Sequence, residues 1–188
     1  MKADVSRIQT RVLRHRSSVP TVTPSLVRRA LSREDLRFVE PWFDDAETRR
    51  WLGDRRWPRR LLELARMPGR SATVFVEGDT PLALLDVERY EDGTAAIAVV
   101  VSPSHRRNGL ASRVIASLRD MPETEGVAEI VAEVEEGNAA ASRLARSSRF
   151  APIPGAEEGF QRFVLVRGAA SGTAHGERQA RPGVRAQA

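Results

Sequence analysis

A short basic loop with one glycine follows an apolar run and precedes a helical pattern. Residues 95–101 are apolar at every position, as in a strand buried on both faces, and the loop beyond them reads Arg106-Arg107-Asn108-Gly109. The first backbone amides of a helix have no partner inside the helix and carry partial positive charge, so they bind phosphate readily. The order of elements therefore predicts an anion site at this helix start, to which Arg106 and Arg107 add charge. The apolar residues at helical spacing are Leu110, Val114, Ile115 and Leu118.

Two other kinds of phosphate-binding loop are excluded by the residues present. A P-loop needs a Gly-Lys-Ser/Thr sequence, and the single lysine of this chain is Lys2. A dinucleotide-binding turn needs three glycines in a parallel strand–helix–strand unit, whereas this loop has one glycine and follows a predicted antiparallel hairpin. Gly109 lets the backbone approach an anion closely, and Ala111 keeps the first helical turn free of bulk.

The elements that must position this loop alternate between strands and helices. Gly78-Asp79 and the stretch 91–94 are typical of hairpin turns. Ser32 and Asp35 form a possible capping box for a helix running toward Trp42, and Pro58 suits the first position of another helix. Strands are predicted at 25–30, 73–77, 81–90, 95–101 and 127–134, with further helices at 44–53, 58–66 and after residue 138.

The loop has the form Arg-x-x-Gly-x-Ala, from Arg106 to Ala111, directly after a Val-x-Pro strand end. It resembles the signature Gln/Arg-x-x-Gly-x-Gly/Ala of the GNAT superfamily of acyl-CoA-dependent N-acyltransferases. The stretch "WFDDAETRRWLG" (42–53) is similar to a pattern of the branch that holds ribosomal-protein N-terminal acetyltransferases and some aminoglycoside acetyltransferases. The resemblance covers residues 26–167. In the next strand and helix of the family, the matching residues are Asn138, Ala141, Leu144 and Phe150.

The resemblance implies a fold and a site for acetyl-CoA. The fold class is α/β: a mixed, mostly antiparallel sheet flanked by helices, in which the fourth strand (95–101) and the fifth (127–134) splay apart. Pantetheine is expected to enter that gap, because an opened strand edge offers unpaired donors and acceptors to an amide-bearing ligand. The pyrophosphate is expected on the loop amides. The expected cofactor-binding residues are Val99, Val101, Arg106, Arg107, Asn108, Gly109, Leu110, Ala111 and Asn138.

Two positions depart from the family pattern. Many relatives carry a tyrosine that protonates the departing thiolate, and Ala145 stands at that position here. The general acid is therefore unassigned, since the single tyrosine, Tyr90, lies at a hairpin end. Arg149 replaces the usual glycine before Phe150, which would cost about 1–2 kcal/mol if the backbone there were left-handed.

Carboxylates on two strands are candidates for a catalytic base. An amine must lose a proton before it attacks a thioester carbonyl, and a carboxylate accepts that proton directly or through water. Strand alternation places Asp86 and Glu88 on one face of the third strand, and Glu133 and Glu135 on one face of the fifth. Glu88 and Glu133 are the candidate catalytic residues, and a solvated strand face is the alternative for each.

Other residues have structural explanations as well. Asn138 follows Gly137 and suits the N-cap of a helix, so capping and cofactor binding both stay open for it. The three tryptophans fit either the core, which is favoured, or the roof of an acceptor pocket; they are Trp42, Trp51 and Trp57. Cysteine is absent and two of the three histidines lie near the chain ends, so no metal site is expected.

The positive charge is concentrated at the ends of the chain. The net charge of +5 divides into +4 for residues 1–25, +2 for residues 168–188 and −1 for residues 26–167. A nucleic-acid-binding domain carries its basic excess on the folded body, so no nucleic acid is expected as a partner of this one. The composition predicts one N-acetyltransferase domain, 26–167, between a basic disordered tail (1–25) and a disordered C-terminal tail (168–188).

The chain has no apolar run near the ~20 residues that a membrane span needs, and no apolar segment near Met1. A cytoplasmic location without a membrane partner is expected. The predicted function is transfer of an acetyl group from acetyl-CoA to a primary amine by direct attack in a ternary complex; the lack of cysteine excludes a cysteine-linked intermediate. The acceptor stays open between a small molecule and a protein N-terminus or lysine. The alternative, suggested by Ala145, is a non-catalytic acyl-CoA-binding module, and a nucleic-acid binder acting through the tails is disfavoured.

Overall fold

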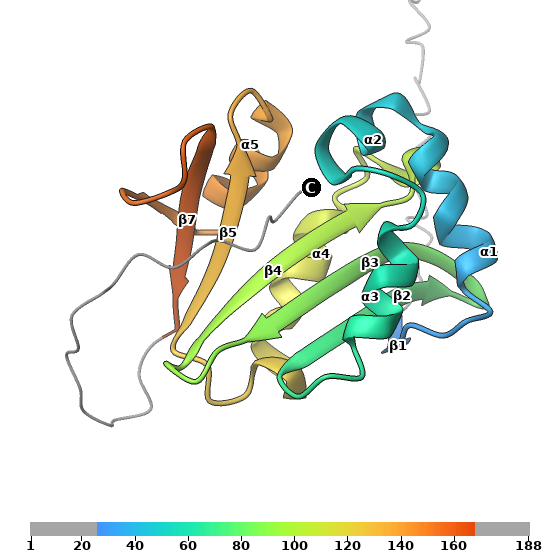
Figure 1. Cartoon of the computed structure of the whole chain (residues 1–188), viewed down its shortest axis with the longest axis horizontal. Helices are drawn as coiled ribbons and strands as arrows, with labels where there is room; N and C mark the ends of the chain where they lie inside the picture. Colours follow the sequence, from blue (N-terminus) through green and yellow to red (C-terminus); the bar gives the residue numbers. More distant parts are fainter. Residues whose placement is uncertain (1–25, 168–188) are drawn as a thin grey trace, which may run out of the picture.

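A seven-stranded sheet organises the structure, a computed structural model that describes residues 26–167 (Figure 1). The two predicted tails lie outside the described residues. The strands follow the order β1-β2-β3-β4-β5-β7-β6, and every neighbouring pair is antiparallel except β4 and β5. This confirms the predicted mixed, mostly antiparallel sheet. The strands are β1 (Val27–Ala30), β2 (Arg70–Glu77), β3 (Thr80–Arg89), β4 (Thr94–Val101), β5 (Glu129–Glu135), β6 (Ala151–Ile153) and β7 (Phe160–Val166).

Helices cover both faces of the sheet, and each face has its own apolar cluster (Figure 1). On one face α1 and α3 pack on residues such as Val74, Leu84 and Val100. On the other face α4 and α5 pack on Leu85, Val99 and Ile130. The helices are α1 (Leu36–Val39), α2 (Ala46–Leu52), α3 (Trp57–Leu64), α4 (Leu110–Ser117) and α5 (Ala139–Ser147), with short 3-10 turns η1 (Glu40–Asp44), η2 (Pro103–His105), η3 (Leu118–Asp120) and η4 (Pro122–Thr124).

The pairing of β4 with β5 ends after three residue pairs. The ladder runs from Thr94↔Glu129 to Ala96↔Val131, whereas β3 stays paired with β4 as far as Val101. On its other side β5 stays paired with β7 to Glu135. Figure 1 shows the two strands starting together and diverging toward α2 and α5. The predicted splay is confirmed, with the fifth strand beginning two residues later than expected.

The helices between β1 and β2 begin within two residues of the predicted starts for α2 and α3, whereas α1 begins at Leu36, after Asp35 and not after Ser32, and is shorter than expected. Asp45 caps α2 by accepting a hydrogen bond from the Thr48 amide at 2.9 Å, and the helix ends at Gly53. The carboxylate of Asp35 accepts bonds from the amide and hydroxyl of Ser32, both at 2.8 Å. The helix expected to run toward Trp42 ends at Val39 and continues as the 3-10 turn η1, whose second residue, Pro41, has no amide to continue the helical ladder.

The end of α5 places Arg149 in the left-handed backbone region, with φ of +69°. The Phe150 amide donates to the Ala145 carbonyl at 3.0 Å, so the chain folds back on the last turn of the helix. This is a helix ending that favours glycine, because a Cβ atom strains a residue in this conformation. The strain anticipated for Arg149 is therefore present in the structure.

Replacing Arg149 with glycine is expected to raise the free energy of unfolding by about 0.5–1 kcal/mol. Relief of strain exceeds the greater entropy of glycine in the unfolded chain, and the exposed arginine side chain packs little. Arg143→Gly is the matched control: the same change at an exposed position inside α5 is expected to cost about 1 kcal/mol. Urea unfolding of both variants measures the difference, and a destabilised Arg149→Gly protein would contradict this reading of the helix end.

Candidate active site

The loop after β4 ends in a glycine that starts α4. Gly109 is the N-cap residue of α4 with φ of +72°, a conformation that side chains rarely adopt, and no side chain caps this helix. A Cβ atom built on Gly109 would meet no atom within 4 Å, so the space beside the helix start is open. Arg107 is exposed and also has a positive φ, of +62°. The loop thus presents an uncapped helix start to open space, a setting that suits an anion.

The side chain of Arg106 is bound to the first turn of α2. Its guanidinium lies 2.7 Å from Glu47 Oε2 and 2.9 Å from Asp45 Oδ2, and it donates to the hydroxyl of Thr48. Two carboxylates therefore neutralise this arginine. The positive side-chain charge expected from two arginines at the loop is that of Arg107 alone, which forms no ion pair with any of the described residues.

The strand edge beside this loop has a partner on one side only. From Ile97 to Val101, β4 pairs with β3 but no longer with β5. The side chains of Val99 and Val101 pack in the cluster under α4, which holds the strand while its outer edge stays unpaired. Leu110 is buried in the same cluster, and Ala111 is half-buried against it. Donors and acceptors of such an edge are available to a ligand with amide groups.

Asn138 occupies the N-cap of α5. Its side-chain oxygen accepts a hydrogen bond from the Ala141 amide at 3.0 Å, and the residue is buried. The capping interpretation is confirmed, while a contact with a cofactor stays a prediction. The residue at the tyrosine position is also part of the fold, since Ala145 is buried in the core under α5.

Three carboxylates gather on the opposite face of the sheet, the face covered by α1 and α3. Glu88 lies 2.8 Å from Arg70 and accepts a hydrogen bond from the Tyr90 hydroxyl at 3.0 Å. Glu133 on β5 is buried and accepts two hydrogen bonds from Arg162, one of them 2.8 Å long. Each predicted base is therefore already bound by an arginine. Both stay predictions as catalytic residues.

Asp86 is the third carboxylate, and it is less well compensated. It is 6% exposed and its nearest cation, Arg70, lies 3.7 Å away, beyond hydrogen-bond distance. Burial raises the pKa of Asp86 to about 6, with a further rise from Glu88 and an opposing effect of Arg70. Its register partner is Ala98 on β4, the strand that borders the gap. Strand alternation groups Asp86 with Glu88, but burial is not readable from the sequence, so alternation alone does not single out Asp86.

Tyr90, which lies beside Glu88 on the same face of the sheet, is held in its neutral form. Burial first, and then the hydrogen bond to Glu88, raise the pKa of Tyr90 well above its ordinary value. The hydroxyl therefore stays protonated at neutral pH and donates its proton to Glu88.

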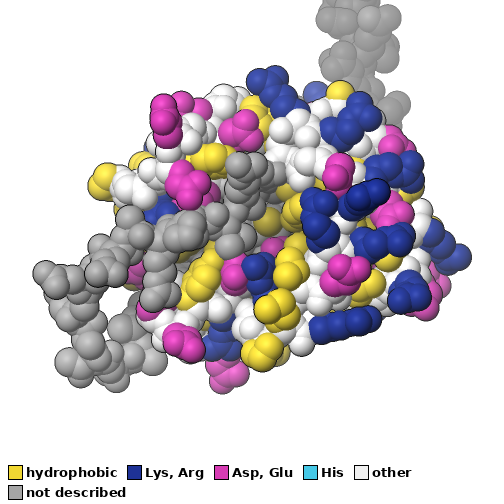
Figure 2. Space-filling view, viewed as in Figure 1, with side chains coloured by type: hydrophobic (Ala, Val, Ile, Leu, Met, Phe, Trp, Pro, Cys, Tyr) yellow, Lys and Arg dark blue, Asp and Glu magenta, His cyan; other side chains and the backbone are white. Residues whose placement is uncertain are grey.

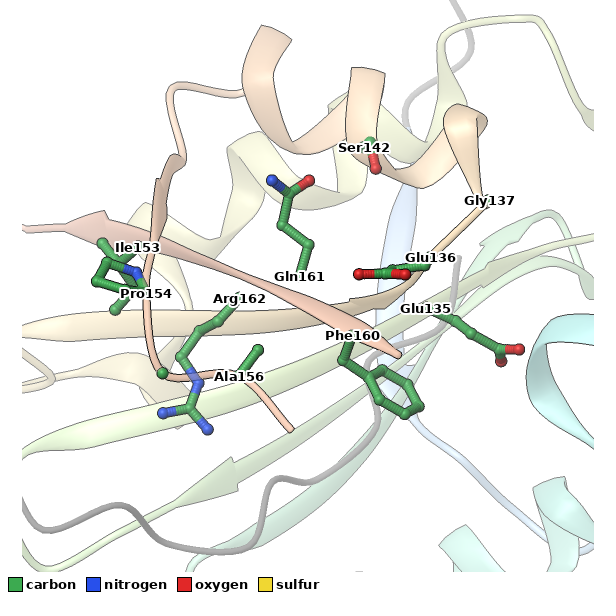
Figure 3. Close-up of a pocket in the computed structure, with 11 residues that line it drawn as sticks. Glu135, Glu136, Gly137, Ser142, Ile153, Pro154, Ala156, Phe160, Gln161 and Arg162 are labelled. Carbon is green, nitrogen blue, oxygen red and sulfur yellow. The ribbon is translucent and has the colours of Figure 1, made fainter. Parts of the chain in front are cut away.

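A hollow of about 430 Å³ lies where β5 ends, between the start of α5 and the connection from β6 to β7 (Figure 3). Figure 3 shows Gln161 extending toward Ser142, with Phe160 and Arg162 on the other side of β7. Glu135 and Glu136 also line this hollow. Arg162 lines this hollow and also binds Glu133, so it lies between the hollow and the carboxylates.

A second hollow, of about 390 Å³, lies among arginines before and within α3. Their charges are largely balanced locally: Arg59 pairs with Glu40 at 2.9 Å, and Arg60 with Asp54 at 3.1 Å. Figure 2 shows basic and acidic side chains interspersed over this part of the molecule. No helix among residues 26–167 is long and apolar enough to cross a membrane, and these residues contain no group of three metal-ligating side chains.

An opened mixed sheet with a glycine-started helix beside the opening defines a class of α/β acyltransferase folds. Residues 32–149 match the model of the acetyltransferase (GNAT) family, so the chain belongs to the GNAT acetyltransferase family. No curated protein matches the chain. Solved structures share its fold at low identity.

An aminoglycoside acetyltransferase, AAC(6′)-Ib, solved with coenzyme A, has a TM-score of 0.65 at 15% identity over 76% of this chain and 95% of its own. Spermidine N-acetyltransferase from Vibrio cholerae, solved with CoA and spermine, has a TM-score of 0.63 at 17% identity, covering 75% of this chain and 95% of its own. An acetyltransferase from Thermus thermophilus has a TM-score of 0.66 at 18% identity, covering 76% of this chain and 97% of its own. At these identities the likeness shows a common fold.

Replacing Asp86 with asparagine is expected to stabilise the protein at neutral pH. The folded state holds the proton of Asp86 more tightly than the unfolded chain, so stability falls as the pH rises from about 4 through about 6. A pKa of about 6 in place of the ordinary value of 3.8 corresponds to at most about 3 kcal/mol, and we expect a gain of about 1–3 kcal/mol at pH 7.5 that largely disappears below pH 4.

Urea unfolding of the wild-type and Asp86→Asn proteins at pH 7.5 and below pH 4 measures this effect. Glu77→Gln, at the exposed end of β2, is the control and should change the free energy of unfolding by less than about 0.5 kcal/mol. If the Asp86→Asn protein is less stable than wild type at pH 7.5, the ion pair with Arg70 outweighs the cost of burying the charge.

Proposed function

We propose that this protein transfers an acetyl group from acetyl-CoA to a primary amine by direct attack in a ternary complex. One observation carries the proposal: the unpaired edge of β4 lies beside the open start of α4, with a buried carboxylate on the neighbouring strand. An amide-bearing thioester would then reach the unpaired edge of β4 through the gap, and an amine would approach from the face that carries the carboxylates. The proposed domain is residues 26–167, between the two tails, and the proposed location is the cytoplasm.

The cofactor side is formed by the gap and the loop. Backbone groups near Val99 and Val101 would pair with pantetheine, and the amides of residues 106–111 would hold the pyrophosphate. Arg107 adds a positive charge there, and Asn138 borders the gap at the end of β5. When bound, acetyl-CoA supplies the thioester carbonyl that the amine attacks. No metal is part of the proposal.

The acceptor side is the face that carries the carboxylates. Asp86, Glu88 and Glu133 form a row of three carboxylates, and their ion-pair partners are the two arginines Arg70 and Arg162. The row therefore has a net charge of −1 when all three carboxylates are ionised. Such a row attracts a protonated amine and accepts its proton before attack. We propose Asp86 as the base, because its raised pKa favours proton transfer near neutral pH and no hydrogen bond from an arginine occupies its oxygens. Glu88 and Glu133 remain the alternatives.

The reaction forms a C–N bond, breaks the C–S bond and releases CoA. One proton leaves the protonated amine for the carboxylate before attack. The second leaves the nitrogen as the C–S bond breaks, and because position 145 is not a tyrosine, water supplies the proton that the departing thiolate takes up. The single tyrosine of the sequence already donates to Glu88. Positioning and polarisation of the thioester supply much of the rate in such a mechanism. Ala145 is also what favours the second candidate function, a non-catalytic acyl-CoA-binding module.

The decisive experiment incubates the purified protein with acetyl-CoA and a panel of amines and follows the release of free thiol. Aminoglycosides and polyamines belong in the panel, because the solved structures of similar fold include an aminoglycoside and a spermidine acetyltransferase. Peptides with a free N-terminus and lysine peptides complete it. Turnover supports the enzyme, whereas binding of acetyl-CoA without turnover of any amine supports the binding module.

Gly109→Asp is expected to weaken CoA binding at least ~10-fold, because it places a carboxylate beside the proposed pyrophosphate position. Gly109→Asn is the matched control: it has the same size and tolerates the same left-handed backbone, but it adds no charge. Calorimetry with CoA measures both. Equal affinities for folded Gly109→Asp and wild-type proteins would contradict the assignment of the loop.

Asp86→Asn is expected to lower kcat at least ~100-fold, as for a lost general base, and to remove the fall in rate of the wild type below about pH 6. The wild-type rate should fall as pH decreases because protonated Asp86 can no longer accept a proton. Glu88→Gln and Glu133→Gln, measured in parallel, compare the alternatives. A larger loss in either of them, with the acidic limb retained in Asp86→Asn, would move the role of base to that glutamate.

A further inference from the structure

Helix α2 lies beside the open end of the gap between β4 and β5 and has contacts with the chain beyond each strand (Figure 1). Its first turn is bound by Arg106, which belongs to the loop after β4. At its other end, Trp51 lies against the turn after β5: a methyl group built at Gly137 would be 3.8 Å from Cη2 of Trp51. In Figure 1, α2 and α5 stand on the two sides of the opening. One short helix thus touches the chain beyond both strands that diverge.

The contact at the first turn is specific in its chemistry. Arg106 forms ion pairs with the carboxylates of Asp45 and Glu47 and donates a hydrogen bond to the hydroxyl of Thr48, a buried residue. Asp45 is also the N-cap of α2, and the hydrogen bond from the Thr48 amide, with Arg106, lowers the pKa of Asp45. A planar guanidinium donates hydrogen bonds to several acceptors at once in fixed directions, whereas the donors of an ammonium group have no such fixed directions.

The contact at the last turn is made by a buried ring. Trp51 is 7% exposed, and the guanidinium of Arg50 lies 4.5 Å from its ring centroid. Trp51 is therefore buried, as the core interpretation predicts, and it lies against the turn between β5 and α5. With seven residues, α2 has too little hydrogen bonding of its own to stay in place without such contacts.

We propose that the side chain of Arg106 has a positioning role: its guanidinium fixes α2 beside the open end of the gap and does not bind the cofactor pyrophosphate, which leaves only the backbone amide of Arg106 for that group. The two arginines of the loop then have different tasks, with Arg107 facing the anion and Arg106 facing α2. The acceptor must reach the carboxylates from the face of the sheet that α1 and α3 cover. Helix α2 lies between α1 and α3 in the sequence and contributes to the apolar cluster on the same face. The position of α2 therefore sets how the amine approaches the thioester. This inference rests on the proposed function.

The test compares Arg106→Gln with Arg107→Gln and with Asp45→Asn. Asparagine at position 45 keeps the N-cap bond to Thr48 but removes the charge that Arg106 binds. We expect Arg107→Gln to raise the Kd for CoA at least ~5-fold, since it removes the unpaired charge beside the pyrophosphate. Arg106→Gln should change that Kd by less than ~3-fold while lowering kcat/KM for the amine at least ~10-fold, because misplacement of a reactant is costly.

The double variant Arg106→Gln/Asp45→Asn separates positioning from independent effects. If both side chains act through α2, the double variant should lose less than ~3-fold beyond Arg106→Gln alone in kcat/KM, because coupled residues are not additive. Arg106→Lys should recover part of the loss, as it retains the charge without the fork. The midpoints of urea unfolding of these variants report whether the contact also stabilises the fold.

Two outcomes would overturn the inference. One is a loss of CoA affinity of ~10-fold or more in Arg106→Gln with unchanged affinity in Asp45→Asn, which would place Arg106 at the pyrophosphate. The other is a double variant whose losses multiply. A wild-type protein that binds CoA but acetylates no amine would overturn the proposed function instead. In that case the CoA affinities and the urea midpoints still decide whether Arg106 serves α2 or the pyrophosphate.

Discussion

A β-strand that loses its neighbour partway along its length leaves backbone donors and acceptors that must find another partner. In this protein β4 loses β5 after Ala96, and the rest of the site follows from that separation. The gap persists because each strand is held from its other side: β4 by β3 as far as Val101, and β5 by β7 as far as Glu135. Apolar packing under α4 and α5 supports the same two strands from below. The opening is therefore a stable part of the fold, open to a ligand that presents amide groups.

The carboxylates near this opening are held by a different balance. Burying a charged group is costly unless it is paired, and Glu88 and Glu133 have arginine partners at hydrogen-bond distance. Asp86 is buried too but shares Arg70 only at 3.7 Å, so part of its burial cost appears as a higher affinity for a proton. A group that is costly to the fold and can exchange a proton near neutral pH is typical of a functional site. The burial that costs stability at position 86 is therefore the same burial that supports the proposal of Asp86 as a base.

Local patterns predicted much of the fold, and long-range side-chain contacts account for what they missed. The uniformly apolar run at 95–101 and the glycine before α4 were sufficient to predict a buried strand and a helix start, because both depend on neighbouring residues. The shortening of the first helix at Pro41 was also readable in principle. In contrast, Arg106 and Glu47 are 59 residues apart in sequence, and nothing local shows that they meet. The burial of Asp86 likewise depends on which elements cover its face of the sheet. Charge at a loop and alternation along a strand thus indicate which residues are candidates, but their partners come from the tertiary structure.

Alternation along β4 also divides the two sides of the site. Val99 faces the cluster under α4, while Ala98, one residue earlier, is the register partner of Asp86 on the opposite face. A strand buried on both faces can therefore pack under α4 and the loop before it with one set of side chains and border the carboxylates with the other. The second set is small near the gap, with alanine at 96 and 98 and valine only at 100. Ala96 and Ala98 are buried, so a larger side chain at either position would collide with groups on the carboxylate face while leaving the α4 face of the strand unchanged, and the small side chains at these two positions are therefore a requirement of the carboxylate face alone.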